Sequence, residues 1–376
     1  MGASVNLAQV VAWGGFAIGL VIGFVGNKTH FCTLGAVSDL INMGDWGRMR
    51  MWLLAIGIAI VGANGLDLLG LIDLGRSIYR TPDFTWLSYL VGGFLFGVGM
   101  TLASGCGTKT LIRIGNGSLK SVVVFLVLGV VAYVSLRGVL GVVRVGALEP
   151  AAIRLPGGQD LPALLSQATG LVRGTLQILV TAALGGGLIV FALARRDFWT
   201  ADHLLGGITV GLAIVAGWYL TGHVGYGENP DTLEMTHFGT NSGRPESVTN
   251  VAPFAYTLEL LMLWTDASRT VTFAIAVVFG IVLGSAVHSV LTGRFRIEGF
   301  RTTEDTGNHL AGAALMGFGG VVAMGCTFGQ GITGVSTLAL GSIVTFFAIV
   351  AGAAATMKLQ YWRIVRATEA DPVRVE

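Results

Sequence analysis

Long apolar runs separated by short charged stretches dominate this chain. A helix needs about 20 predominantly apolar residues to cross the hydrocarbon core of a bilayer. Runs that are long enough, or nearly so, lie at 7–26, 52–66, 86–104, 122–136, 175–194, 203–220, 271–291, 309–324 and 332–357. The pattern therefore predicts an all-α, polytopic inner-membrane protein with about nine transmembrane helices. In the first run, Gly15, Gly19 and Gly23 predict a face for close helix packing.

Two shorter segments interrupt the regular pattern. Residues 27–36 carry few charges between apolar neighbours, and 256–264 is apolar but too short to span a bilayer. We expect the first to dip back into the membrane and the second to be an interfacial or re-entrant helix. The longest polar stretch, 223–269, contains Asn-Pro and Gly-Arg-Pro turns and is expected to be a large loop.

The region 137–173 mixes polar residues with Pro and Gly and predicts a connection between two halves. We expect one transport domain, 1–376, that consists of a first half-repeat at 7–145 and a second at 174–357. Gly is abundant, at 57 residues, as expected where membrane helices approach closely or break.

Composition narrows the class of protein further. Hydrophobic residues make up 53% of the chain and charged residues 12%, well outside the range of a soluble domain. The net charge of +2 gives no reason to expect a nucleic-acid partner, so membrane lipid is the expected surrounding. Three cysteines without a C-x-x-C spacing or a histidine cluster exclude the common zinc and dithiol signatures, and we expect no metal or cofactor. The amino-terminal residues lack a basic segment, so the first run is expected to be a retained helix.

A glycine-flanked cysteine at the end of an apolar run occurs twice. Five residues recur in the same order and spacing, Gly97, Gly99, Ala103, Gly105 and Cys106 matching Gly317, Gly319, Ala323, Gly325 and Cys326. With nine crossings, the two runs that lead to these cysteines point in opposite directions. We therefore expect an inverted repeat with broken helices that meet at a central site.

The distribution of basic residues predicts the orientation. Most of the 23 Lys and Arg residues fall on the side of the membrane that also holds the carboxy terminus. The positive-inside rule then places the carboxy terminus in the cytoplasm and the amino terminus in the periplasm. Tryptophans at 52, 86, 218, 264 and 362 are expected to anchor helices at the membrane interfaces.

The cysteines admit three interpretations. A single membrane cysteine is usually a small packing residue, but Cys32, Cys106 and Cys326 all lie where the helical pattern fails. A redox pair is the second interpretation, which distant cysteines permit only if the fold brings them together. The third is a thiol-lined path for a sulfur-containing ligand, since a thiol is a soft, weak hydrogen-bond donor. Short half-helices after Cys106 and Cys326, at 108–114 and 328–333, would present positive dipole ends that favour an anion.

The surrounding motifs resemble the YeeE/YedE family of sulfur-transport membrane proteins. The resemblance rests on His30-Phe31-Cys32-Thr33-Leu34-Gly35, Ser104-Gly105-Cys106-Gly107, Met324-Gly325-Cys326-Thr327-Phe328-Gly329-Gln330-Gly331 and Gly217-Trp218-Tyr219-Leu220-Thr221-Gly222. It implies a thiosulfate importer, not an enzyme, with the three cysteines along the path. Another sulfur or selenium compound is the alternative substrate, and a membrane-embedded thiol redox or sulfur-transfer protein is the alternative class.

The expected substrate-binding residues are the three cysteines and their neighbours: His30, Gly105, Gly107, Lys109, Gly325, Thr327 and Gln330. Interface location is the favoured alternative for His30, while positive-inside anchoring for Lys109 and helix capping for Gln330 are equally open at this point. We expect protonated thiols to donate S–H hydrogen bonds to the ion, which then crosses intact. A cytoplasmic sulfurtransferase of the TusA type is the expected acceptor, if trapping drives uptake.

Overall fold

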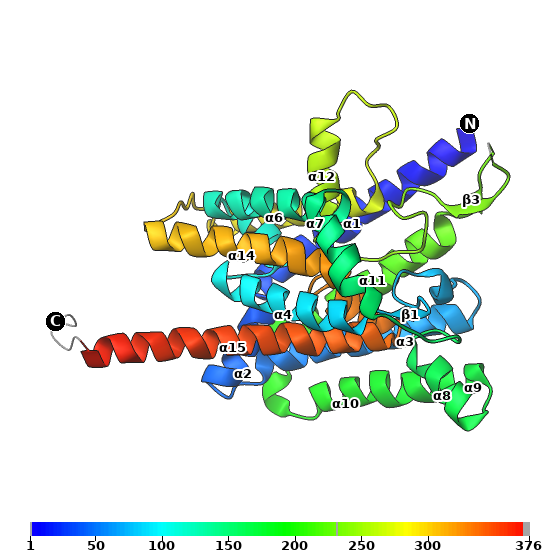
Figure 1. Cartoon of the computed structure of the whole chain (residues 1–376), viewed down its shortest axis with the longest axis horizontal. Helices are drawn as coiled ribbons and strands as arrows, with labels where there is room; N and C mark the ends of the chain where they lie inside the picture. The colour runs from blue at the N-terminus through cyan, green and yellow to red at the C-terminus, as the bar shows by residue number, and fades with distance from the viewer. Residues whose placement is uncertain (1, 231, 371–376) are drawn as a thin grey trace.

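The computed structural model of the protein describes residues 2–230 and 232–370. The described residues are mainly helical, and eight helical segments among them are long and apolar enough to cross a membrane. The chain is therefore a multi-pass, all-α membrane protein (Figure 1). The helices are α1 Gly2–Lys28, α2 Thr33–Asn42, α3 Gly47–Leu68, α4 Trp86–Leu102, α5 Gly107–Gly115, α6 Leu119–Arg137, α7 Val139–Val143, α8 Leu161–Thr169, α9 Arg173–Val180, α10 Gly187–Leu193, α11 Ala201–Tyr219, α12 Ala252–Met262, α13 Phe273–Leu291, α14 Thr303–Val322 and α15 Leu340–Ala370.

Short irregular helices and strands complete the described structure. The irregular helices are η1 Leu74–Arg76, η2 Arg144–Leu148, η3 Glu149–Ala151, η4 Thr181–Gly186, η5 Arg196–Phe198, η6 Leu220–Val224 and η7 Gly329–Gly334. Strand β1 Asp83–Phe84 pairs antiparallel with β2 Ile153–Arg154, and β3 Tyr226–Glu228 pairs antiparallel with β4 Met235–His237.

The helix α14 is the ninth long segment among the described residues. Glu304 and Asp305 in its first turn make it less apolar than the others, yet it packs against both α4 and α6. The last run differs from the prediction, because α15 begins at Leu340 and not at 332. Residues 329–334 instead form a separate π-helical turn, η7.

Glycines allow several helices to pack with their backbones nearly in contact. A Cβ on Gly19 would lie 2.4 Å from the carbonyl oxygen of Val277, and one on Gly23 would lie 2.1 Å from that of Ile281. Both distances are too short for any side chain, so the predicted glycine face of α1 is the surface that packs along α13.

Helix contacts occur in matching pairs. The α1–α13 contact corresponds to the α11–α3 contact, and the α4–α15 contact corresponds to the α14–α6 contact. At the centre, α4 and α14 run antiparallel, because Gly92 lies against Gly319 while Gly99 lies against Gly312. An inverted repeat predicts these pairs, and we propose that α1–α6 and α11–α15 are its halves, close to the predicted 7–145 and 174–357.

The polar stretch 223–269 is only partly a surface loop. After the β3–β4 hairpin, the chain enters the protein, where Val248, Asn250 and Val251 are at most 1% exposed. It then forms α12, an 11-residue helix that packs against α6 and α13 and is too short to span. The sequence pattern did not reveal this buried passage, because Ser247, Thr249 and Asn250 have the polarity of loop residues.

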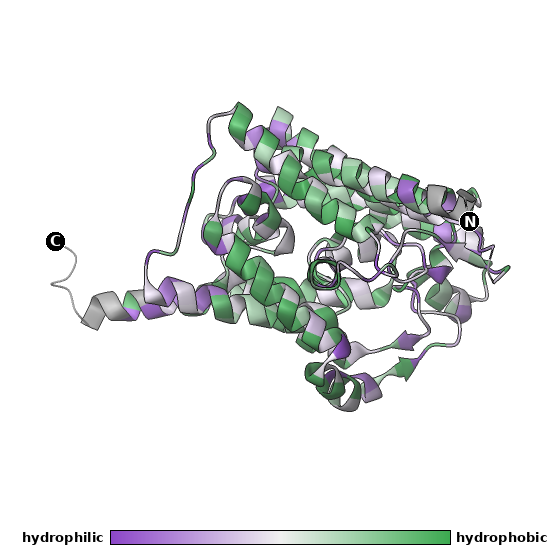
Figure 2. Ribbon diagram, turned by 90° about the horizontal axis from the view of Figure 1, so that it is seen from above, coloured by the Kyte–Doolittle hydropathy of each residue, from purple (hydrophilic) through white to green (hydrophobic). Residues whose placement is uncertain are grey.

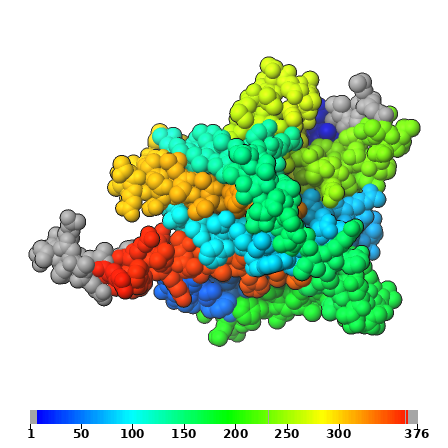
Figure 3. Space-filling model, viewed as in Figure 1, coloured from blue at the N-terminus to red at the C-terminus, as the bar shows by residue number. Residues whose placement is uncertain are grey.

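Hydrophobic residues follow the helices, whereas hydrophilic residues gather in the loops and toward the carboxy-terminal end of α15 (Figure 2). That end of α15 extends beyond the rest of the described helices (Figure 3). Three of the tryptophans expected at the interfaces are indeed exposed, namely Trp86, Trp264 and Trp362. The prediction was wrong for Trp52 and Trp218, which are 1% and 0% exposed and lie in the core.

Candidate functional site: a buried thiol centre

Each cysteine follows the same local backbone structure. A long helix ends at a non-glycine residue in the left-handed conformation, and the cysteine follows two positions later. The left-handed residues are His30, Ser104 and Met324, with φ of 52°, 56° and 58°. The residue before each cysteine donates its N–H to a carbonyl of the preceding helix: Phe31 to Gly26 (3.1 Å), Gly105 to Met100 (2.9 Å) and Gly325 to Gly320 (2.8 Å). This is the Schellman type of helix end. The positions of the cysteines are therefore set by three equivalent helix breaks.

Each cysteine also begins the next helical segment. The carbonyls of Cys32, Cys106 and Cys326 accept the first hydrogen bonds of these segments, from Ala36 (3.0 Å), Thr110 (2.9 Å) and Gln330 (2.7 Å). The thiols thus lie beside the amino-terminal ends of α2, α5 and η7, where free N–H groups and the helix dipole favour a negative charge. For Cys106 and Cys326 this agrees with the predicted half-helices at 108–114 and 328–333.

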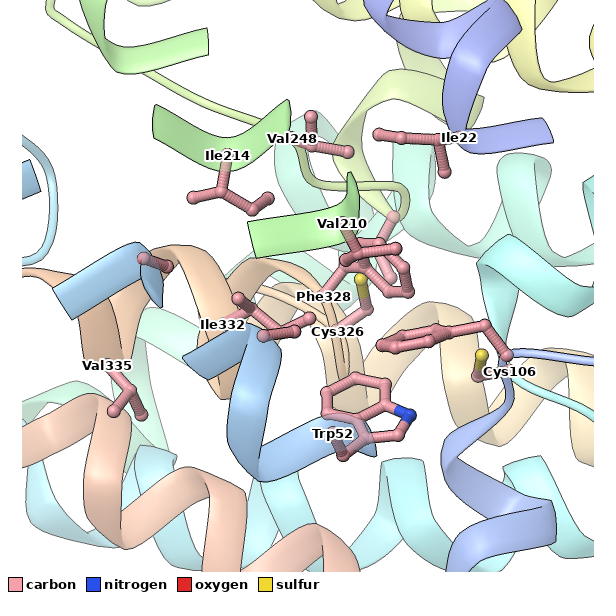
Figure 4. Packing of buried hydrophobic residues seen from close by; sticks show 14 of the residues in the cluster. Ile22, Trp52, Cys106, Val210, Ile214, Val248, Cys326, Phe328, Ile332 and Val335 are labelled. Atoms are coloured by element: carbon pink, nitrogen blue, oxygen red, sulfur yellow. The ribbon is translucent and has the colours of Figure 1, made fainter. Parts of the chain in front are cut away.

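Cys106 and Cys326 both belong to the buried core, part of which Figure 4 shows. They are 1% and 0% exposed, and the hydroxyl of Thr327 lies next to the Cys106 thiol. The backbone N–H of Gly329 donates to Sγ of Cys326 at 3.4 Å. The loop of the second cysteine therefore contributes directly to the surroundings of the first.

Asn250 and Thr249 complete the centre, and sequence reasoning missed both. The backbone N–H of Asn250 and the hydroxyl of Thr249 lie next to the Cys326 thiol. The side-chain amide of Asn250 donates to Thr108, in the first turn of α5, at 2.6 Å. The buried segment from the polar stretch thus connects the loops of Cys106 and Cys326. The sequence repeat gave no counterpart for Cys32, and the relation appears only in the structure, where Val251 precedes α12 as Cys32 precedes α2.

A large basic cavity reaches the third cysteine. It has a volume of about 1000 Å³, and its lining includes Cys32, Arg48, Lys109, Arg113 and Lys358. A smaller cavity of about 300 Å³ shares His30, Lys109 and Arg113 with it and adds Lys120, Arg294 and Arg296. We term these two spaces together the basic cavity. Such a concentration of positive charge attracts anions.

The expected site residues divide into four groups. His30 and Lys109 line the basic cavity, whereas Thr327 lies at the thiol centre. Gln330 donates its amide to the carbonyl of Ala323 at 2.5 Å, so the structure gives it a helix-capping contact. The glycines Gly105, Gly107 and Gly325 flank the thiols; at Gly107 an added Cβ would lie 3.4 Å from Cβ of Asn250. Their contact with a substrate stays a prediction.

A second cavity lies near the β3–β4 hairpin. It has a volume of about 530 Å³, and its lining includes Arg76, Arg80, His237 and Arg244. Burial lowers the pKa of His237, which favours the neutral imidazole there. Arg80 is held by the carbonyl of Thr337 (2.8 Å) and an ion pair with Asp67 (3.2 Å). We term this space the hairpin cavity; in Figure 1 the hairpin and the carboxy-terminal end of α15 are at opposite ends of the molecule.

Comparison with known proteins agrees with this arrangement. The family model described as "Sulphur transport" matches residues 28–355, which include all three cysteines and both halves of the fold. The thiosulfate transporter TsuA of Escherichia coli is 25% identical over 332 residues, which cover 85% of this chain and 86% of the relative. The thiosulfate transporter TsuA of Spirochaeta thermophila is 24% identical over 349 residues, which cover 88% of this chain and 93% of the relative. Three cysteine-bearing helix breaks in a multi-pass membrane fold, together with a match over most of the sequence, place the chain in the sulphur transport family, the YeeE/YedE family that its motifs resemble.

Proposed function

We propose that this protein imports thiosulfate, or a closely related sulfur-containing anion, along a path through its three thiols. The observation that carries the proposal is the meeting of the Cys106 and Cys326 loops in the core, with Thr327 of one loop beside the thiol of the other. Both matched relatives are named thiosulfate transporters, which supports this choice among sulfur anions.

We propose that the ion meets the thiols in the order Cys326, Cys106, Cys32. Tyr79, next to the hairpin-cavity residue Arg80, lies near Cys326. Cys106 lies near both other cysteines, and Cys32 lines the basic cavity. The positive-inside rule supports a cytoplasmic basic cavity, with the amino terminus in the periplasm. The ion would then enter by the hairpin cavity and leave by the basic cavity.

A protonated thiol suits this task. Thiosulfate carries two negative charges and would be repelled by a thiolate, whereas an S–H group can donate to its terminal sulfur. The N–H groups at the starts of α5 and η7 and the hydroxyls of Thr249 and Thr327 offer neutral hydrogen bonds to the ion. These groups bind without a fixed counter-charge, so the ion can move on without covalent transfer of sulfur.

The test is uptake of thiosulfate labelled separately on its two sulfurs, in cells that lack other importers. Wild-type protein should bring both labels inside in equal amounts and should not transport sulfate. Cys106→Ala and Cys326→Ala should each reduce uptake to background at unchanged levels of folded protein, because only one small side-chain atom is removed. We expect Cys32→Ala to cause a severe defect as well.

The possible outcomes separate the candidate functions. Normal uptake by both alanine variants would refute the thiol path. Entry of one label only, or a persulfide trapped on Cys326, would favour the membrane-embedded sulfur-transfer alternative. Uptake of another sulfur or selenium compound in preference to thiosulfate would keep the path but change its substrate.

A cytoplasmic sulfurtransferase of the TusA type is the proposed acceptor. If it consumes the imported ion, deleting it from the host should lower accumulation over minutes and leave the initial rate of entry unchanged. An unchanged accumulation would argue against this partner.

A further inference from the structure

Trp52 of α3 has an unpaired hydrogen-bond donor in the core of the protein. The side chain is 1% exposed, and its Nε1 has no hydrogen-bond partner among the described residues. An indole nitrogen can only donate, so no alternative assignment of the side chain removes this imbalance. A buried donor left without an acceptor costs about 1–3 kcal/mol.

The other fully buried tryptophan shows how this fold normally satisfies an indole. Trp218 of α11 is 0% exposed, and its Nε1 donates to the hydroxyl of Ser336 at 3.0 Å. Of these two buried tryptophans, only Trp52 has an indole N–H without an acceptor among the described residues.

Trp52 lies between aromatic residues that belong to two cysteine loops. It stacks on Phe31, the residue before Cys32, with ring centroids 5.0 Å apart. It meets Phe328, two residues after Cys326, edge to face at 5.6 Å. Phe31 and Phe328 also contact each other, at 5.7 Å. These three rings form a continuous aromatic cluster between the Cys32 loop and the Cys326 loop.

The cluster joins the loop of a thiol that lines a cavity to the loop of a buried thiol. Cys32 lines the basic cavity, whereas Cys106 and Cys326 are at most 1% exposed. The benzene edge of Trp52 faces η7, since a Cβ on Gly331 would lie 3.5 Å from its Cζ3. Nε1 is on the other edge of the indole, and Figure 4 shows it on the side of the ring that faces Cys106.

We propose that Trp52 closes the passage between the basic cavity and the two central thiols, and that its indole N–H binds an oxygen of the anion that passes. This inference rests on the proposed function and adds a binding group to it. Thiosulfate has a soft sulfur at one end and three oxygens at the other. The thiols suit the sulfur, and a neutral N–H suits an oxygen. The three rings also present an apolar barrier to water and to free ions while no substrate is bound.

The experiment removes the N–H and keeps the ring. Trp52→Phe deletes the donor, and replacement of Trp52 by 3-benzothienylalanine, in which sulfur stands in place of the N–H, deletes it at nearly unchanged shape. Loss of one hydrogen bond to an anion should lower the initial rate of thiosulfate uptake about ten- to hundred-fold below saturation. The melting temperature of the 3-benzothienylalanine variant should stay the same or rise, because an unpaired buried donor has been removed at nearly unchanged shape. That of Trp52→Phe should fall, because the smaller ring leaves a cavity in the core.

Trp218→Phe is the matched control. It removes an indole N–H that donates to the hydroxyl of Ser336, so it should lower the melting temperature. Uptake per folded molecule should stay near that of the wild type. Reduced uptake per folded molecule in both Trp52 variants, together with unchanged or raised stability of the 3-benzothienylalanine variant, supports the proposal. Normal uptake in both Trp52 variants, or uptake that falls only in proportion to lost stability, overturns it. If the Trp52 variants transport normally while Cys326→Ala does not, only the inference about Trp52 fails; if wild-type protein takes up no thiosulfate, the proposed function fails.

Discussion

At the scale of single residues, the centre of the protein consists of neutral groups. Cys106 and Cys326 are surrounded by Thr249, Thr327 and the amide of Asn250, while the basic side chains are kept in the cavities. This separation of basic cavities from a neutral core suits an anion that must be attracted to a cavity and then pass the core without being bound tightly. A fixed cation at the centre would bind a divalent anion strongly and slow its release.

Glu246 gives a prediction that depends on pH. It lies just before the buried segment, and its Oε1 is buried without a hydrogen-bond partner among the described residues. Burial raises the pKa of its carboxyl to about 7, although hydrogen bonds from Asn241 and Ser242 lower it. Because the pKa in the folded protein is above the ordinary value of about 4.3, the protonated carboxyl favours folding. This contribution is complete below about pH 4 and is lost as the pH rises through about 7.

The wild-type melting temperature in detergent should therefore fall between pH 5 and pH 8, and Glu246→Gln should fall less over that range. Glu228→Gln is the control, because Glu228 is exposed in β3 and its replacement should leave the wild-type trend. A Glu246→Gln curve parallel to the wild-type curve would show that this carboxyl is already ionised in the folded protein.

The sequence predicted the three cysteines and Thr327 but not the other groups around them. The cysteines were recognisable because each follows an apolar run beside Gly, Thr or another small residue. Asn250 and Trp52 were not, because their roles depend on contacts across the fold: a polar loop residue enters the core, and a tryptophan at a helix start turns inward. The relation between Val251 and Cys32 emerges only from the order of the elements in the structure.

At the scale of elements, the recurring unit is a long helix, a left-handed residue, a cysteine and a short helix. Glycine is the usual residue in such a helix end, because a side chain in the left-handed region costs about 1–2 kcal/mol. Here His30, Ser104 and Met324 occupy the position instead. The lengths of the long helices followed from the apolar runs, and the breaks followed from glycines and polar neighbours. The start of α15 did not, since residues 332–334 belong to η7 and a turn at 337–338 precedes α15.

Ser104 allows the strain at these breaks to be measured. Its side chain is exposed to the basic cavity, so few packing contacts are lost on substitution. Ser104→Gly should stabilise the protein by about 1 kcal/mol, because glycine adopts the left-handed conformation without strain. Ser104→Val should destabilise it by about 1–3 kcal/mol, because a β-branched residue is disfavoured there. Thermal unfolding in detergent measures both, and equal stability of the two variants would show that the helix end rearranges.

At the scale of the whole molecule, the basic cavity, the hairpin cavity and the repeat bear on the direction in which the ion crosses the protein. The repeat makes the two halves similar, but the charges and the thiols are distributed unequally between them. Cys32 has no partner thiol, because Val251 occupies the related position, and the basic cavity opens on the Cys32 side only. We infer that this asymmetry, and not the backbone, distinguishes the entry from the exit.

Cys32 can report which side of the membrane the basic cavity faces. It is the one cysteine that lines this cavity among those described, and it is 8% exposed, whereas the other two thiols are buried more deeply. A small, positively charged, membrane-impermeant thiol reagent should therefore modify Cys32 in inside-out vesicles and not in intact cells. A Cys32→Ser variant shows the background from other thiols and should remain unlabelled in both preparations. Labelling of Cys32 in intact cells, and not in inside-out vesicles, would place the basic cavity outside. In that case the basic cavity would be the entry, the carboxy-terminal end of α15 beside it would be periplasmic, and the order of the thiols along the path would be reversed.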